Sequence, residues 1–271
     1  MSETKLRILG TVAPYPKGDL NCPGYLIKDD KYNILLDCGN GSTRLLNMKE
    51  DLNNLKIFIS HLHPDHIGDL ASLMQAIYVY KKYGYVDGTP DLYIPESFET
   101  REISYTDADG WGASKSETVH MHDYDYIKKY AEVAGVNLNK VSTKLNFDNI
   151  YFESIKVPHP IETYAFKIKT DFGTIVYSGD TGTKNDLKTF AKNSDLFICE
   201  STYQRGEYRA EDYHLFAHEA AQIAEKAKAK QLILTHFWPE TDKENYVKEA
   251  KEYFENVEAA VEGKEYVLRR K

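Results

Sequence analysis

The chain has 271 residues, of which 42% are hydrophobic and 28% are charged, and its net charge is −8. This length and composition allow one large domain with a substantial core and exclude wholesale disorder. The acidic balance is unlike that of a non-specific nucleic-acid binder, and three cysteines without close spacing exclude a disulfide framework or a cysteine-based zinc finger.

The first half of the chain begins with short apolar runs bounded by Gly, Pro, Asp or Asn. These runs predict strands at residues 6–9, 25–27, 34–36 and 57–59. Apolar residues at helical spacing then predict a helix over residues 70–83. A strand at residues 91–95, a polar Gly/Ser-rich loop at 106–118 and a helix at 123–134, ended by Gly135, complete this half.

The second half of the chain is richer in strands. The same patterns predict strands at residues 151–157, 164–170, 174–177, 195–199 and 231–235. Residues 214–229 form an alanine-rich helical pattern. With no internal repeat or Pro-rich linker, we expect one α/β domain over residues 1–271, with a Tyr-rich helical insert at about 70–135.

The strongest chemical signal is an H-x-H-x-D-H run that directly follows the strand ending at residue 59. His61 and His63 are two residues apart in extended chain and can face one cation together. Asp65 and His66 follow a turn and can face a second cation. Imidazole and carboxylate ligands suit zinc, and also manganese or iron. A merely His-rich surface loop is the alternative, and four ligand-type residues within six positions argue against it.

Three more ligand-type residues each follow a predicted strand. They are His159 in VPHP, Asp180 in SGDT and His236 in LTHF. Sites in α/β proteins are often built at the carboxyl ends of strands. Each residue alone is weak evidence, but together with the run they complete a set for two metal ions.

This combination resembles the metallo-β-lactamase-fold hydrolases over nearly the whole chain, including an L-D-x-G turn at residues 36–39. The resemblance implies an αββα sandwich of two mixed sheets flanked by helices. It also implies that Asp37 orients the metal-binding loop without touching a metal.

The resemblance further implies a division of the ligands between two divalent ions. One ion is bound by His61, His63 and His159, the other by Asp65, His66 and His236, and Asp180 bridges them. A hydroxide between the metals is then the nucleophile, and Asp65 holds it in position.

Two further segments resemble the ribonuclease Z-like phosphodiesterases. Cys-Glu-Ser-Thr at residues 199–202 is similar to that family's H-E-A-T segment, and His214 is similar to its H-S-T histidine. The resemblance implies a proton-transfer pair of Glu200 and His214, in which the imidazole protonates the leaving group, and it implies a homodimer. The alternative is that both residues are structural.

The departures from that family bear on the substrate. Between His159 and Asp180 there is room for one hairpin and none for a tRNA-binding arm. The loop at residues 14–21 lacks the family's Arg, and Phe-Trp-Pro at 237–239 replaces Ser-Arg-Tyr. We therefore expect small phosphodiesters or single-stranded nucleic acid as substrates, and weak or no processing of tRNA.

The sequence leaves three functions open. The favoured one is a dinuclear phosphodiesterase, the second is a thioester or lactone-like carbonyl hydrolase on the same metals, and the third is a metal-binding protein without catalysis. His120 and His122 are interpreted as surface or lid residues, and His218 as a packing or solvated residue. Without a signal peptide or a membrane-spanning run, we expect a cytoplasmic protein.

Overall fold

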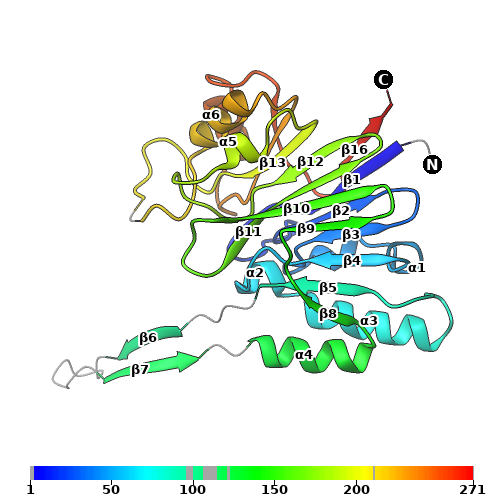
Figure 1. Ribbon diagram of the computed structural model, residues 1–271. Helices are drawn as coiled ribbons and strands as arrows, with labels where there is room; N and C mark the ends of the chain where they lie inside the picture. The colour runs from blue at the N-terminus through cyan, green and yellow to red at the C-terminus, as the bar shows by residue number, and fades with distance from the viewer. Residues whose placement is uncertain (1–2, 96–99, 106–114, 121–122, 210, 271) are drawn as a thin grey trace.

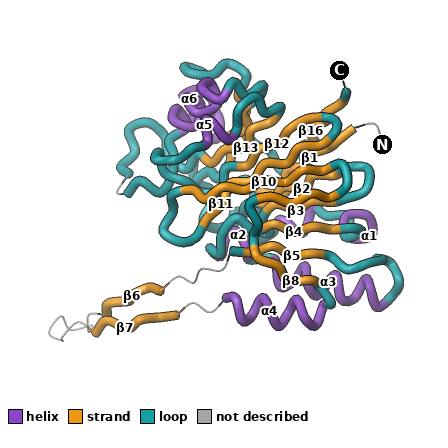
Figure 2. Tube along the Cα trace, in the orientation of Figure 1, coloured by secondary structure: helices purple, strands orange, loops and turns teal. Residues whose placement is uncertain are grey.

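The computed structural model describes residues 3–95, 100–105, 115–120, 123–209 and 211–270. Within these residues, two seven-stranded sheets face each other and helices cover their outer faces (Figure 1). Figure 2 shows the strands of the two sheets together, with helices at both sides. The expected αββα sandwich is confirmed.

The first sheet combines the N-terminal strands with the C-terminal one. Its order is β16 (Glu265–Arg269), β1 (Glu3–Gly10), β2 (Gly24–Lys28), β3 (Asn33–Leu36), β4 (Leu55–Phe58), β5 (Asp91–Ile94) and β8 (Asn137–Lys140). Pairing is antiparallel from β16 to β3 and parallel from β3 to β8. Every residue of β3 is buried, as expected for a strand covered on both faces.

The second sheet is mixed in the same way. Its order is β15 (Val257–Ala259), β14 (Leu232–Thr235), β13 (Leu196–Glu200), β12 (Gly173–Tyr177), β11 (Thr163–Thr170), β10 (Ile150–Val157) and β9 (Lys144–Phe147). Pairing is parallel from β15 to β12 and antiparallel from β12 to β9. Aromatic rings from both sheets fill the layer between them, among them Phe58, Phe152 and Phe166.

Helices cover the outer faces because their apolar stripes pack on the sheets. The described helical segments are η1 (Ser42–Leu45), α1 (Met48–Asp51), α2 (Pro64–Ile67), α3 (Leu70–Lys82), α4 (Asp123–Ala134), α5 (Leu187–Phe190), α6 (Ala217–Ala227) and α7 (Lys243–Ala250). One apolar cluster joins α3 and α4 to the first sheet, and another joins α5, α6 and α7 to the second. Among the described residues, no helix has the length and apolar character needed to cross a membrane.

Two expected boundaries are wrong. The helix expected from residue 214 begins at Ala217, because Phe216 has an extended backbone and its N–H is bonded to the Glu219 side chain. The loop expected at 106–118 gives way from residue 115 to β7 (Lys115–His120), which pairs with β6 (Thr100–Tyr105), whereas residues 106–114 lie outside the described chain. The strand expected at residues 91–95, within the segment expected as an insert, is β5 (Asp91–Ile94) of the first sheet.

Candidate metal centre

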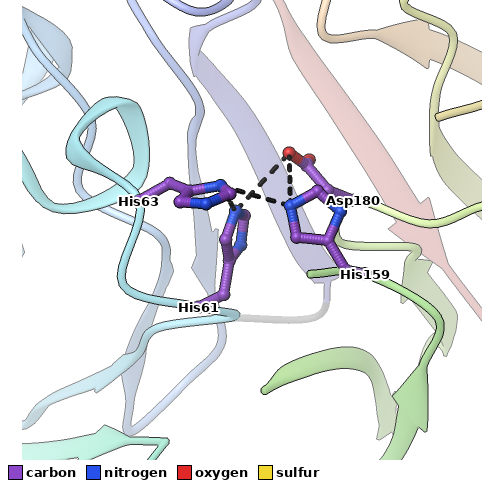
Figure 3. Close-up of side chains that lie close together, drawn as sticks. All are labelled: His61, His63, His159 and Asp180. Atoms are coloured by element: carbon purple, nitrogen blue, oxygen red, sulfur yellow. Dashed lines mark hydrogen bonds and ion pairs between the residues drawn. The ribbon is translucent and has the colours of Figure 1, made fainter. Parts of the chain in front are cut away.

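The first group of candidate ligands comes from two separated segments. His61 and His63 follow β4, and His159 follows β10, so the sandwich brings them together at one end (Figure 3). The His63 Nδ1 atom lies 3.0 Å from His61 Nε2 and 3.2 Å from His159 Nε2. Three ring nitrogens thus face a common point, the arrangement that a bound cation requires.

The second group lies directly beside the first. His66 Nε2 is 3.4 Å from His236 Nε2, and Asp65 Oδ2 is 3.5 Å from the same His236 atom. Asp65 and His66 belong to α2, where Pro64 occupies the first turn, and His236 follows β14. The two groups therefore share the short segment from His61 to His66.

Asp180 lies between the groups, on the segment after β12. Its Oδ2 atom is 3.5 Å from His61 Nε2 and 3.1 Å from His236 Nε2. Its Oδ1 atom is buried and has no hydrogen-bond partner among the described residues. A buried carboxylate oxygen without a partner is costly, and a cation would satisfy it. These nitrogen and oxygen donors therefore fit divalent metal ions.

The electrostatics of the cluster also suit a cation. Burial lowers the pKa of His61 well below its ordinary value and that of His159 to about 4, so both rings are neutral, as metal ligands must be. Burial opposes charge on His236 as well, but the Asp180 carboxylate beside it raises the pKa of His236 to about 10. The Asp180 carboxylate thus favours positive charge beside two neutral imidazoles, and a bound cation would supply that charge.

Four of the imidazoles use their other ring nitrogen for an oxygen partner. Their Nδ1 atoms lie 2.7 to 3.2 Å from these oxygens: His61 from Ser60 Oγ, His66 from Asp37 Oδ2, His159 from the Tyr213 carbonyl and His236 from Thr202 Oγ1. Such partners fix the ring orientation and leave Nε2 free to bind a metal. The sequence identified Asp37 among these partners but not Ser60, Tyr213 or Thr202.

Asp37 is a buried hub behind the metal-binding loop. Its carboxylate accepts hydrogen bonds from the Ser60 N–H at 2.6 Å, the Ser60 hydroxyl at 2.8 Å and the Tyr177 hydroxyl at 2.8 Å, besides its contact with His66. The backbone of Asp37 is left-handed, with φ of 57°. Tyr177 comes from the other sheet, so this one carboxylate ties both sheets to the metal-binding loop.

Glu200 and His214 form a pair at the edge of the cluster. His214 Nδ1 lies 3.0 Å from Glu200 Oε1, and its ring stacks on that of His236 with centroids 5.3 Å apart. Glu200 is fully buried and also accepts the N–H groups of Thr181 and Leu215. The His214 side chain is 23% exposed and lines the cavity in front of the cluster.

The remaining histidines lie elsewhere or outside the described residues. His218 is bonded through Nδ1 to Glu249 Oε1 at 2.5 Å and belongs to neither ligand group. His122 and the side chain of His120 fall outside the part of the chain that the structure describes. The cavity that the candidate ligands line is also lined by Tyr203 and Trp238, to which the sequence pattern assigned no role.

Comparisons with known proteins agree with this architecture. Residues 32–237 match the family profile of the Beta-lactamase superfamily domain. A Ribonuclease Z of Picrophilus torridus is 30% identical over 270 residues, covering 87% of this chain and 86% of its own.

Two solved structures share the fold. The metallo-beta-lactamase fold protein YhfI of Bacillus subtilis superposes with a TM-score of 0.80 at 24% identity, covering 98% of this chain and 99% of its own. Human tRNase Z, short form, superposes with a TM-score of 0.70 at 18% identity, covering 98% and 100%. The sequence match over most of the chain, together with this fold and ligand set, shows that the protein belongs to the beta-lactamase superfamily, with ribonuclease Z among its homologues.

Proposed function

We propose that the protein is a dinuclear metal-dependent phosphodiesterase of the ribonuclease Z-like type. The observation that carries the proposal is the Glu200–His214 pair beside the cluster of candidate ligands. A nitrogen of His214 lies within 4.8 Å of candidate ligand atoms of Asp180 and His236. An imidazole held by a carboxylate at this place is suited to protonating a leaving oxygen.

The charge state of His214 supports this role. Burial opposes protonation of the ring, but the Glu200 carboxylate and then Asp180 raise the pKa of His214 above its ordinary value. Glu200 therefore stabilises the protonated form of His214 relative to an ordinary imidazole. Glu200 accepts a hydrogen bond from the Nδ1–H group of His214. The Nε2–H group of the same ring is then the proton donor to the substrate. A thioester would not require this acid, because a thiolate leaves without a proton.

The proposed reaction divides its work among named residues. Divalent ions at the two ligand groups would polarise the phosphoryl group and lower the pKa of an attacking water. Asp65 accepts a proton from that water and orients it. Glu200 stabilises the His214 imidazolium before the transfer. As the bond between phosphorus and the leaving oxygen breaks, the Nε2 proton of His214 passes to that oxygen, and solvent then reprotonates the neutral imidazole while Asp65 releases its proton to solvent.

The substrate class follows from the relatives and from the size of the connecting segment. Relatives named ribonuclease Z support a phosphodiester, including one in nucleic acid. Between His159 and Asp180, however, β11 and β12 form one plain hairpin. We therefore propose that the preferred substrates are small or single-stranded phosphodiesters rather than folded tRNA. Zinc is the proposed metal, and a homodimer stays a prediction that light scattering can test.

The test compares leaving groups in the His214→Ala variant. With a diester that releases a poor, alkoxide leaving group, we expect turnover to fall by about 10²–10⁴. With p-nitrophenolate as the leaving group, which needs no proton, the loss should be much smaller. The metal content, measured by elemental analysis, should stay unchanged, and His218→Ala is the matched control because His218 lies outside the ligand groups.

Other outcomes contradict the proposal. Equal losses with both leaving groups would mean that His214 only positions the substrate or supports the fold. Hydrolysis of a thioester by the zinc-loaded protein, with no turnover of either diester, would establish the alternative carbonyl hydrolase. Efficient 3′ cleavage of a precursor tRNA, well above that of small diesters, would refute the proposed preference for small substrates.

A further inference from the structure

Trp238 lines the same cavity as the candidate metal ligands. This cavity has a volume of about 470 Å³, and Asp65, Asp180 and His236 are also among its lining residues. Cavities of this size accommodate small organic ligands. The Trp238 side chain is 41% exposed although it directly follows the buried Phe237. A large ring is thus held at a reactive centre without being covered by protein.

The backbone next to Trp238 is held in place by hydrogen bonds and by packing of Phe237. The Phe237 N–H bonds to the Thr11 carbonyl at 2.9 Å, and the Ala13 N–H bonds to the Phe237 carbonyl at 3.0 Å. The Phe237 ring packs on Tyr246 with centroids 4.8 Å apart. Residues 11–13 and 237 therefore form one hydrogen-bonded unit, which fixes the position of the adjacent Trp238.

Tyr15 supports the indole from the side. The two rings are 5.8 Å apart at 77°, an edge-to-face contact. The Tyr15 hydroxyl donates to Glu240 at 3.2 Å, and Lys17 pairs with the same carboxylate. The Lys17 charge is thereby paired with Glu240, and Lys17 is not among the described residues that line the cavity.

The kinds of side chain that line the cavity indicate what kind of substrate it binds. Among the described residues that line the cavity, none is Lys or Arg. A polyanionic backbone is normally gripped by such cations, whereas aromatic side chains stack on the planar faces of bases. The two segments that meet here, 14–21 and 237–239, are those that depart from the ribonuclease Z-like pattern by lacking its arginines.

We propose that Trp238 is a stacking platform for a nucleobase of the phosphodiester substrate, with Tyr15 bracing the indole while the scissile phosphate lies at the metal centre. The inference rests on the proposed function for the identity of the reacting group. It adds that recognition depends on a planar heteroaromatic ring rather than on charge, which makes small nucleotide diesters the substrate class.

The test uses two non-chromogenic diesters that differ only in the base: the trifluoroethyl esters of adenosine 5′-monophosphate and of 1-deoxyribose 5-phosphate. With the zinc-loaded full-length protein, we expect a KM for the adenosine ester that is lower by about 5- to 150-fold, the range of stacking on one aromatic side chain. Trp238→Ala should abolish this difference by raising only the adenosine KM, and Trp238→Phe should retain most of it. Tyr83→Ala, an exposed ring on α3's C-terminal end, is the matched control.

A binding measurement separates this inference from the proposed function. Calorimetric titration of the metal-free protein with adenosine 5′-monophosphate and with 1-deoxyribose 5-phosphate should show the same preference, and Trp238→Ala should remove it. No preference for the base in either assay overturns the stacking platform, as does an equal rise of both KM values in Trp238→Ala. If neither ester is hydrolysed but the binding preference holds, the proposed function fails and the platform stands.

Discussion

Asp37 shows how much one buried carboxylate contributes to this site. It accepts hydrogen bonds from Ser60 and Tyr177 and orients His66, so it couples the metal-binding loop to both sheets. Its left-handed backbone, with φ of 57°, costs a non-glycine residue on the order of 1 kcal/mol. The four contacts offset that cost. Replacing the charge should therefore weaken both the metal site and the fold.

The corresponding prediction is that Asp37→Asn lowers zinc affinity by about 10- to 100-fold, the usual effect of losing a partner that orients a ligand. The amide places N–H groups against the Ser60 and Tyr177 hydroxyls and no longer accepts all of their protons. Competition with a chromogenic chelator measures the affinity. Asp186→Asn, at an exposed aspartate with no side-chain cap bond, is the control, and an unchanged affinity in Asp37→Asn would be contrary to this account.

The cysteines lead to a second prediction at this scale. Burial raises the pKa of the Cys22 thiol to about 12 and those of Cys38 and Cys199 well above the ordinary value. Because the thiolate is the reactive form, the folded protein should not react with iodoacetamide at about pH 8. In denaturant all three thiols should be alkylated, as counted by mass spectrometry. Rapid modification of the folded protein would mean that these residues are accessible.

At the scale of elements, the turn after β3 and the metal-binding loop are packed backbone to backbone. The Cys38 N–H bonds to the His66 carbonyl at 2.8 Å, and the Asp69 N–H bonds to the Cys38 carbonyl at 3.0 Å. A Cβ atom on Gly39 would lie 2.0 Å from the Asp65 carbonyl oxygen. The glycine of the L-D-x-G turn is therefore required by this close approach.

We predict that Gly39→Ala displaces the loop that carries Asp65 and His66. Zinc affinity should fall by about tenfold or more, and the free energy of unfolding should fall by about 1–3 kcal/mol, as for other overpacked sites. Chelator competition and urea unfolding measure the two effects. Gly206→Ala is the control for the zinc measurement, because a methyl group at that position would meet no other atom within 4 Å. Its backbone, with φ of 93°, disfavours any side chain, so this variant should lose stability while its zinc affinity stays unchanged.

For the whole molecule, a buried apolar layer between the two sheets holds them together. Phe152 on β10 is fully buried, stacked on Phe58 of the other sheet at 4.0 Å and packed on Phe166 at 5.4 Å. Phe152→Ala should therefore lower the free energy of unfolding by about 3–5 kcal/mol. Urea unfolding followed by circular dichroism tests this, with the exposed Tyr83→Ala as control. A loss below about 1 kcal/mol would mean that the two sheets do not depend on this contact.

Some local structure could not be predicted because its signal lies in other parts of the chain. Lys115–His120 is polar and was expected to be mostly loop, but it pairs with Thr100–Tyr105 as β7. The polar strand β8 is short and half exposed, and its place is set by β5. Phe216 delays the start of α6 because Glu219 bonds to its N–H. In each case a partner segment supplies hydrogen bonds that composition does not reveal.

The sequence by itself determined the fold family, the strands that precede each candidate ligand and the identity of those ligands, because strand periodicity and the H-x-H-x-D-H spacing are local properties. Only the tertiary structure decided that His159, Asp180 and His236 lie beside that run, since the packing of two sheets brings together segments more than 90 residues apart. It alone also placed Thr202 behind His236 and Trp238 in the lining of the cavity beside the candidate ligands. Neither Thr202 nor Trp238 belongs to a metal-ligand pattern in the sequence. The role of each depends on the side chains that the folded chain places around it.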